Sequence, residues 1–214
     1  MEILQPASTS PSPAKSPAPK PNTAADQMTY LKGVSFRTTI GFVKAKAGDE
    51  GVQKVFEKLP EEIRSSLSRT ILSTEFYPFD WLVALQGAAV DVVGGDRRTT
   101  LRDLGRFSCE SALTSVYKIF FKLGSPDYII KKATQVYGTY FKGGGEIHII
   151  DDSKGFVQLK IDRYPGGHSD FCRRLDGYFE RTLELSGAKN TQVVHSLCAY
   201  HGGGKACEWT ARWS

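Results

Sequence analysis

The stretch EIHIIDDSKGFVQLKID, residues 146–162, marks the point where the chain changes from helices to strands. Its two halves are rich in β-branched and other apolar residues, and Ser153-Lys154-Gly155 separates them, so it predicts a β-hairpin. Residues 168–187 follow with apolar side chains at helical spacing, and residues 190–213 predict two more strands around the triple glycine at 202–204. The C-terminal half therefore predicts a ββαββ unit.

The residues before this unit have helical periodicity. Helices are predicted at 35–59, with a break at Gly48-Asp49, and then at 59–72, 77–93, 98–107, 109–124 and 125–142. Ser125-Pro126 is a typical N-cap and first-turn pair for the last of them. The predicted fold class is α/β of the α+β kind, an N-terminal helical bundle packed on a ββαββ antiparallel sheet unit.

Composition separates a short tail from one larger unit. Residues 1–28 are rich in Pro, Ala and Ser and predict a disordered tail, whereas residues 29–214 have the apolar content of a single domain. No apolar run suits a signal peptide or a membrane span, which predicts a cytoplasmic protein that does not contact membranes. The net charge of +5 is modest and the charges are interleaved, so we expect no nucleic-acid binding.

The sequence lacks the common catalytic motifs. It contains no Gly-x-Ser-x-Gly, no P-loop and no dinucleotide-binding fingerprint. We therefore expect a protein that is not an enzyme and has no catalytic residues.

Several phrases of the sequence resemble known ligand-binding domains. They are FYPFDWLVAL (76–85), GRFSCESALTSVYKIFFKLGSP (105–126) and FCRRLDGYFERTLELSGAKNTQVVHSLCAYHGGGKACEW (171–209). In their order they resemble bacterial vinyl-reductase-like sensor domains, aromatic-sensing input domains and heme-nitric-oxide-binding (H-NOX) proteins, and most of all an uncharacterised myxobacterial paralogous family. More distantly they resemble Bet-type subunits of vesicle-tethering complexes. The resemblance implies a vinyl-reductase/H-NOX-like fold.

The same resemblance implies a zinc site near the C-terminus. The related domains carry one Cys at the start of the closing helix, then Glu-x-x-Cys, then a final Cys after seven residues. Here Cys172, Cys198 and Cys207 match the cysteines, His195 replaces the glutamate, and the last interval is eight residues. Cys3His is a common ligand set for structural zinc, so the predicted metal ligands are Cys172, His195, Cys198 and Cys207.

Strand geometry leaves alternatives open at this site. In a regular strand His195 would face away from Cys198, so a β-bulge near Ser196 would be needed to bring the imidazole round. His201, in the turn, is a substitute ligand. Buried free thiols and a disulfide are the other interpretations of the three cysteines. Cys109 has no counterpart in the related domains and is expected to be a buried small side chain.

Aromatic side chains predict a candidate ligand pocket between the closing helix and the helix at 126–141. Its predicted lining is Tyr117, Phe121, Tyr137, Tyr140, Phe171 and Tyr178. Heme is not expected, because the helix that carries the proximal histidine in H-NOX proteins has none here and the chain has no Tyr-x-Ser-x-Arg.

The function that these features favour is a regulatory sensor domain. We expect it to bind a small hydrophobic ligand, to act through a protein partner, and to be a candidate homodimer. The alternative is a ligand-free protein-interaction module that resembles the vesicle-tethering-complex subunits.

Overall fold

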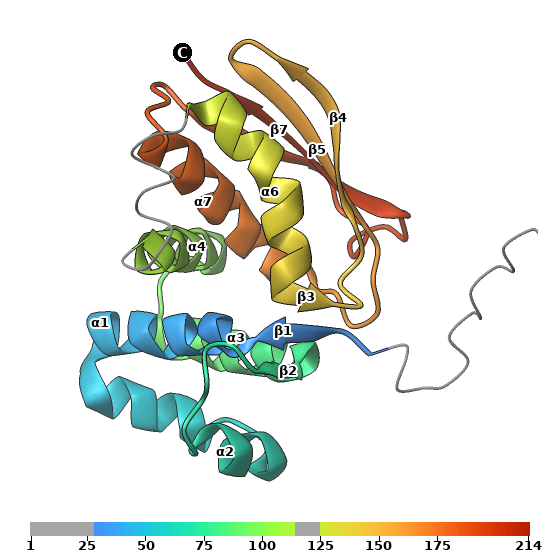
Figure 1. Cartoon of the computed structure of the whole chain (residues 1–214). Helices are drawn as coiled ribbons and strands as arrows, with labels where there is room; N and C mark the ends of the chain where they lie inside the picture. The colour runs from blue at the N-terminus through green and yellow to red at the C-terminus, as the bar shows by residue number, and fades with distance from the viewer. Residues whose placement is uncertain (1–27, 114–124) are drawn as a thin grey trace, which may run out of the picture.

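The computed structural model describes residues 28–113 and 125–214 (Figure 1). Its helices are α1 (Gly33–Glu57), α2 (Glu61–Leu67), α3 (Phe79–Val93), α4 (Arg97–Leu113), α6 (Pro126–Tyr140) and α7 (Ser169–Leu185). Its strands are β1 (Tyr30–Lys32), β2 (Phe76–Pro78), β3 (Phe141–Lys142), β4 (Ile147–Ser153), β5 (Phe156–Asp162), β6 (Gln192–Leu197) and β7 (Ala206–Arg212). This order confirms the prediction of helices followed by a ββαββ unit.

The ββαββ unit forms one four-stranded antiparallel sheet with the order β4-β5-β7-β6. The two hairpins join where β5 pairs with β7, with Leu159 opposite Trp209. Alternate residues of these strands, such as Val157, Leu159 and Trp209, are buried. Both α6 and α7 pack on this apolar face, and together with it they enclose the C-terminal core (Figure 1).

A second, three-stranded sheet was not predicted from the sequence. It has the order β2-β1-β3, and it pairs Leu31 with Tyr77 on one side and with Phe141 on the other. Its strands are two or three residues long, too short for an alternating pattern to stand out. The sheet ties the start of α1 to the end of α6.

One break inside a helix and two helix boundaries can be compared with the sequence predictions. In α1, Gly48 has φ 69° and ψ −170°, which is not helical and confirms the predicted break. The helix predicted to reach residue 72 instead ends at Leu67, and Leu72 is 51% exposed. Ser125 caps α6, because its side chain accepts a hydrogen bond from the backbone N–H of Tyr128.

The helices α4 and α7 cross in direct backbone contact. A Cβ atom on Gly105 of α4 would lie 1.9 Å from the carbonyl oxygen of Arg174, and a Cβ on Gly177 of α7 would lie 1.9 Å from that of Arg102. Only glycine leaves room at these two positions, so the crossing fixes α7 relative to α4. Cys172 and Arg174, in the first turns of α7, are positioned by this contact.

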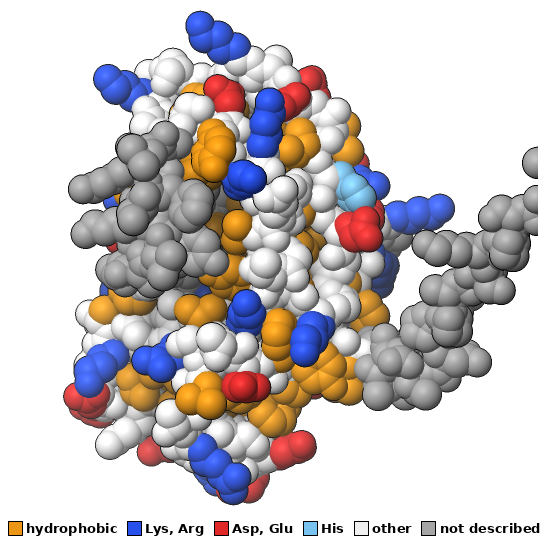
Figure 2. Space-filling model, in the orientation of Figure 1, with side chains coloured by type: hydrophobic (Ala, Val, Ile, Leu, Met, Phe, Trp, Pro, Cys, Tyr) orange, Lys and Arg blue, Asp and Glu red, His pale blue; other side chains and the backbone are white. Residues whose placement is uncertain are grey.

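Charges of both signs cover the surface. Figure 2 shows Lys and Arg interspersed with Asp and Glu on the face that carries α6. Within the described part of the chain, no helix is long and apolar enough to cross a membrane.

Candidate functional site

The first candidate site lies between the start of α7 and the end of the β6–β7 hairpin. The N-cap residue His168 accepts a hydrogen bond from Asp170 N, so α7 begins at Ser169 and buries Cys172 against the sheet. Cys207 is on the inward face of β7, in line with Trp209 and Ala211. The two sulfur atoms, Cys172 Sγ and Cys207 Sγ, are 3.6 Å apart.

A β-bulge in β6 brings His195 to the side of the sheet that carries the cysteines. His195 pairs with Trp209, but the next pair is Leu197 with Glu208, so Ser196 is an extra residue in β6. The Ser196 hydroxyl donates to the Glu208 carbonyl at 3.2 Å. The bulge stands where the four-ligand interpretation required one, and His195 stacks on Trp209 with ring centroids 4.3 Å apart.

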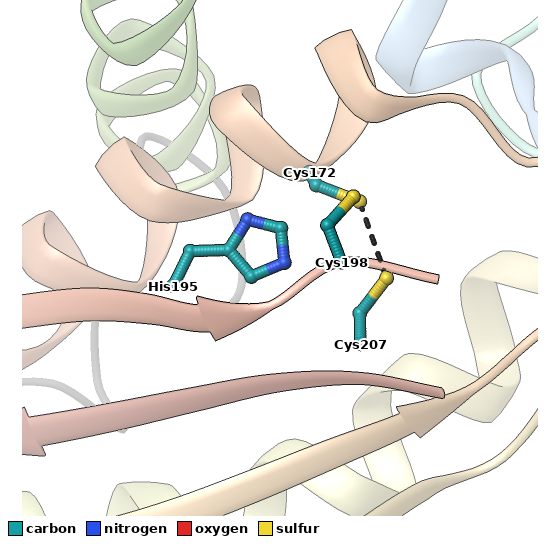
Figure 3. Close-up of side chains that lie close together, drawn as sticks. All are labelled: Cys172, His195, Cys198 and Cys207. Carbon is teal, nitrogen blue, oxygen red and sulfur yellow. Dashed lines mark hydrogen bonds between the residues drawn. The ribbon is translucent and has the colours of Figure 1, made fainter. Parts of the chain in front are cut away.

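The structure therefore brings together all four residues of the predicted metal site. One ligand atom from each of Cys172, His195, Cys198 and Cys207 lies within 4.8 Å of the others, and Figure 3 shows the side chains converging. His201, the substitute ligand, is exposed and lies outside this cluster. All four cysteines of the chain are free thiols in the structure, so the disulfide alternative is not the one observed.

His195 is a buried imidazole whose hydrogen-bonding capacity is unused. Its side chain is 1% exposed, and neither ring nitrogen has a hydrogen-bond partner among the described residues. The nearest carboxylate oxygen, Asp176 Oδ1, is 4.0 Å from Nδ1 and accepts instead from Trp209 Nε1 at 2.8 Å. Buried polar groups in folded proteins are rarely left unpaired, so each exception needs an explanation. A metal ion held between the imidazole and the thiols would provide one.

The three thiols differ in acidity. The hydrogen bond from the Cys172 thiol lowers the pKa of Cys207, and the Ala199 N–H, 3.3 Å from the sulfur, acts in the same direction. The pKa of Cys172 is raised, first by that hydrogen bond to Cys207 and then by burial. Burial also raises the pKa of Cys198. Zinc binds cysteine as the thiolate, so binding would release the thiol protons and leave three thiolates and an imidazole, a donor set suited to zinc.

The second candidate site is a cavity of about 430 Å³ between α6, α7 and the N-terminal helices. Tyr137, Tyr140, Phe171 and Tyr178 line it, whereas Tyr117 and Phe121, the other two predicted lining residues, lie outside the described residues. The Tyr137 ring stacks on Phe141, with centroids 4.5 Å apart, and its hydroxyl donates to the Gly144 carbonyl at 2.8 Å. The volume lies within the range of about 300–1,000 Å³ of small-molecule sites.

The cavity wall contains one functional candidate that the sequence analysis missed. Arg174 lines the cavity and is only 4% exposed. Burial lowers its pKa to about 10, which leaves the guanidinium charged at neutral pH. One feature of the sequence could have identified Arg174. It lies on the apolar stripe of α7, three residues after Phe171 and next to Leu175.

Comparison with solved structures identifies the fold. An H-NOX protein from S. oneidensis in the Fe(II)NO ligation state aligns with a TM-score of 0.65 and 15% identity, over 86% of this chain and 99% of that one. An Fe(II) unliganded H-NOX protein from K. algicida aligns with a TM-score of 0.63 and 13% identity, over 86% and 97%. No family model matches the sequence, and no curated protein matches it either. The chain therefore has an H-NOX-like α+β fold, and its place in a myxobacterial family stays a prediction.

These neighbours correct the expectation that heme is unlikely. Structures of this fold include the Fe(II) forms above and one that concerns heme redox potential and porphyrin distortion, which aligns with a TM-score of 0.64 and 12% identity. The expectation was wrong because it rested on the residues of one sequence motif, whereas cysteine and tyrosine can also hold heme iron. The described cavity lining offers both types, in Cys109 and in tyrosines such as Tyr137. Burial raises the pKa of the Cys109 thiol to about 11.

Proposed function

We propose that this chain is a non-enzymatic sensor domain that binds a small ligand in the cavity between α6 and α7 and signals to a protein partner. The observation that carries the proposal is the cavity, because about 430 Å³ of space lined mainly by apolar and aromatic side chains has the size and character of a small-molecule site. Heme is one candidate occupant, and when bound it would supply a redox-active iron. Cys109 and the cavity tyrosines are the described residues that would hold it.

The ligand-binding proposal is tested by filling the cavity. Val136 of α6 lines the cavity, whereas Thr139 of the same helix is exposed and does not. Native mass spectrometry of the purified protein should show a bound small molecule, which Val136→Trp removes and Thr139→Trp retains. If neither the purified protein nor the protein exposed to hemin or small apolar probes binds anything, the ligand-free interaction module becomes the better interpretation.

We also propose that Cys172, His195, Cys198 and Cys207 hold a structural zinc ion. Two observations support this: the unpaired buried imidazole, and the 3.6 Å separation of Cys172 Sγ from Cys207 Sγ. Two sulfurs bound tetrahedrally at about 2.3 Å from zinc would lie about 3.8 Å apart. The ligands come from α7, β6 and β7 and the segment just after β6, so the ion would fasten the closing helix to the last hairpin.

Metal analysis tests the zinc proposal. The purified protein should contain one zinc per chain, and Cys198→Ser should lose the metal and lower the melting temperature. Cys109→Ser is the matched control, because Cys109 contacts Thr182 at the cavity and lies outside the cluster. The proposal fails if the wild-type protein, refolded with zinc, retains none after dialysis, or if Cys198→Ser and Cys109→Ser retain it equally.

A further inference from the structure

We propose that the cavity binds an amphipathic molecule with an apolar body and a carboxylate, and that Arg174 binds the carboxylate. This inference rests on the proposed ligand-binding function and specifies the class of ligand. Its basis is a buried guanidinium on the wall of an apolar cavity, with no carboxylate partner among the described residues.

Among the residues that the structure describes, those that hold Arg174 are neutral. Nη1 donates to Thr39 Oγ1 at 3.0 Å, and Nη2 donates to Ser108 Oγ at 2.8 Å, to Thr38 Oγ1 at 3.1 Å and to the Ser35 carbonyl at 3.3 Å. The three hydroxyls donate their own protons to helix carbonyls of Ser35 and Leu104. They therefore orient the guanidinium as acceptors but do not neutralise its charge.

The neighbouring arginines at the same helix crossing, unlike Arg174, form ion pairs with glutamates. Arg102 and Arg106 of α4 both contact Glu180, and Arg181 of α7 contacts Glu184. Residues 114–124, TSVYKIFFKLG, contain no acidic residue. Buried charges in proteins are normally paired, because removing a charge from water is costly. Among the described residues, Arg174 thus lacks the carboxylate partner that its neighbours have.

The described cavity lining complements such a ligand in charge as well as in shape. Its charged residues are Arg174 and Lys132, both positive, and it contains no aspartate or glutamate. Lys132 is exposed at the rim, whereas Arg174 is buried. The remaining lining is mostly aromatic and aliphatic, for example Tyr137, Phe141 and Leu175. A carboxylate on Arg174 would form charge-assisted hydrogen bonds, with the apolar body against these side chains.

Two sources could supply this chemistry: a small free carboxylic acid, or the propionate of a heme. The first arm of the experiment uses the purified wild-type protein and titration calorimetry with 2-naphthoate against 2-naphthamide, and decanoate against decanamide. Each pair keeps the apolar body and changes only the charge. We expect at least one acid to bind about tenfold or more tightly than its amide, as for a charge-assisted contact.

Variants identify the responsible cation. Arg174→Gln should abolish the preference for the acid, and Lys132→Gln should retain it. The opposite pattern, or equal binding of acid and amide to the wild-type protein, overturns the inference but leaves the ligand-binding function standing. If Arg174→Gln does not fold, by circular dichroism, the comparison on the wild-type protein decides. If no probe binds, including hemin, both the inference and the ligand-binding function fail.

Hemin separates the two sources. A Soret band whose half-saturation concentration rises about tenfold in Arg174→Gln, but not in Lys132→Gln, assigns the carboxylate to a heme propionate. Binding of an acid at Arg174 without hemin binding assigns it to a free acid. The inference is contradicted if hemin binds equally well to the wild-type protein and to Arg174→Gln, and if neither acid binds more tightly than its amide.

Discussion

Replacing Gly105 with alanine should destabilise the protein, although alanine is the better helix former. The Cβ atom would lie 1.9 Å from the Arg174 carbonyl oxygen and 2.9 Å from the Tyr178 backbone nitrogen, and such contacts essentially never fall below 3.0 Å. The helices α4 and α7 would therefore have to separate by about 1 Å. Inserting an extra methyl group into a packed interface costs about 1–3 kcal/mol.

Helix propensity acts in the opposite direction, because alanine is favoured over glycine in a helix interior by about 1 kcal/mol. The net effect should be a loss of up to about 2 kcal/mol, or a fall in melting temperature of up to about 8 °C for a domain of this size. Circular dichroism during thermal unfolding measures it. Gly177→Ala should behave in the same way, because its Cβ would meet the Arg102 carbonyl oxygen at 1.9 Å.

Gly138→Ala provides the matched control. Gly138 is exposed in α6, and a Cβ atom there would meet nothing within 4 Å. Only the propensity term remains, so this variant should be more stable by up to about 1 kcal/mol. The double variant at Gly105 and Gly177 should lose less than the sum of the two single losses, because one separation of the helices relieves both contacts. If Gly105→Ala raised the melting temperature as Gly138→Ala does, the close crossing of α4 and α7 would be refuted.

Two further predictions concern a helix cap and a partly exposed ion pair. Ser125→Ala removes the side chain that accepts from the Tyr128 N–H at 3.3 Å, so it should cost about 1 kcal/mol in urea unfolding, while Ser125→Asp should retain most of the stability. The hydrogen bond from Arg106 lowers the pKa of Glu184 below its ordinary value of 4.5. The stability that this carboxylate contributes is therefore complete above about pH 4.5 and is lost as the pH falls through the lower folded-state pKa. Arg106→Gln should make urea midpoints depend less on pH between about 3 and 5, and an unchanged dependence would contradict this account.

The larger elements could be predicted because their patterns are long. The ββαββ order follows from two hairpin patterns and from the apolar stripe of α7, and the structure confirms it. Strand alternation showed that the four-ligand interpretation needed a bulge near Ser196, since His195 and Cys198 cannot share a face of a regular strand, and the structure has this bulge. The periodicity of the residues was enough to predict an element wherever that element was long enough to show a repeat.

What the sequence did not reveal depends on contacts between distant segments. The pairing of β1 with β2 and β3 joins residues far apart in the chain through strands of two or three residues. Arg173 and Arg174 are adjacent and identical in type, yet only Arg174 turns toward α1 and α4 and is buried at a cavity. That no carboxylate of the described residues pairs with Arg174 can be seen only once α1, α4 and α7 are placed together. The role of Gly105 likewise appears only once α7 lies against it.

The first turns of α7 carry both the cysteine cluster and the cavity arginine. Cys172 and Arg174 are two residues apart, which places them about 200° apart around the helix axis. A rotation of α7 that presses one against its partners would withdraw the other, whereas the backbone contacts at Gly105 and Gly177 oppose any such rotation. An ion held at the cysteine cluster and a ligand held at Arg174 would therefore contact the same rigid helix. Any coupling between these two proposed sites would have to be equal in both directions, so a ligand in the cavity would change the affinity of the cluster for an ion by the same factor as the ion would change the affinity of the cavity.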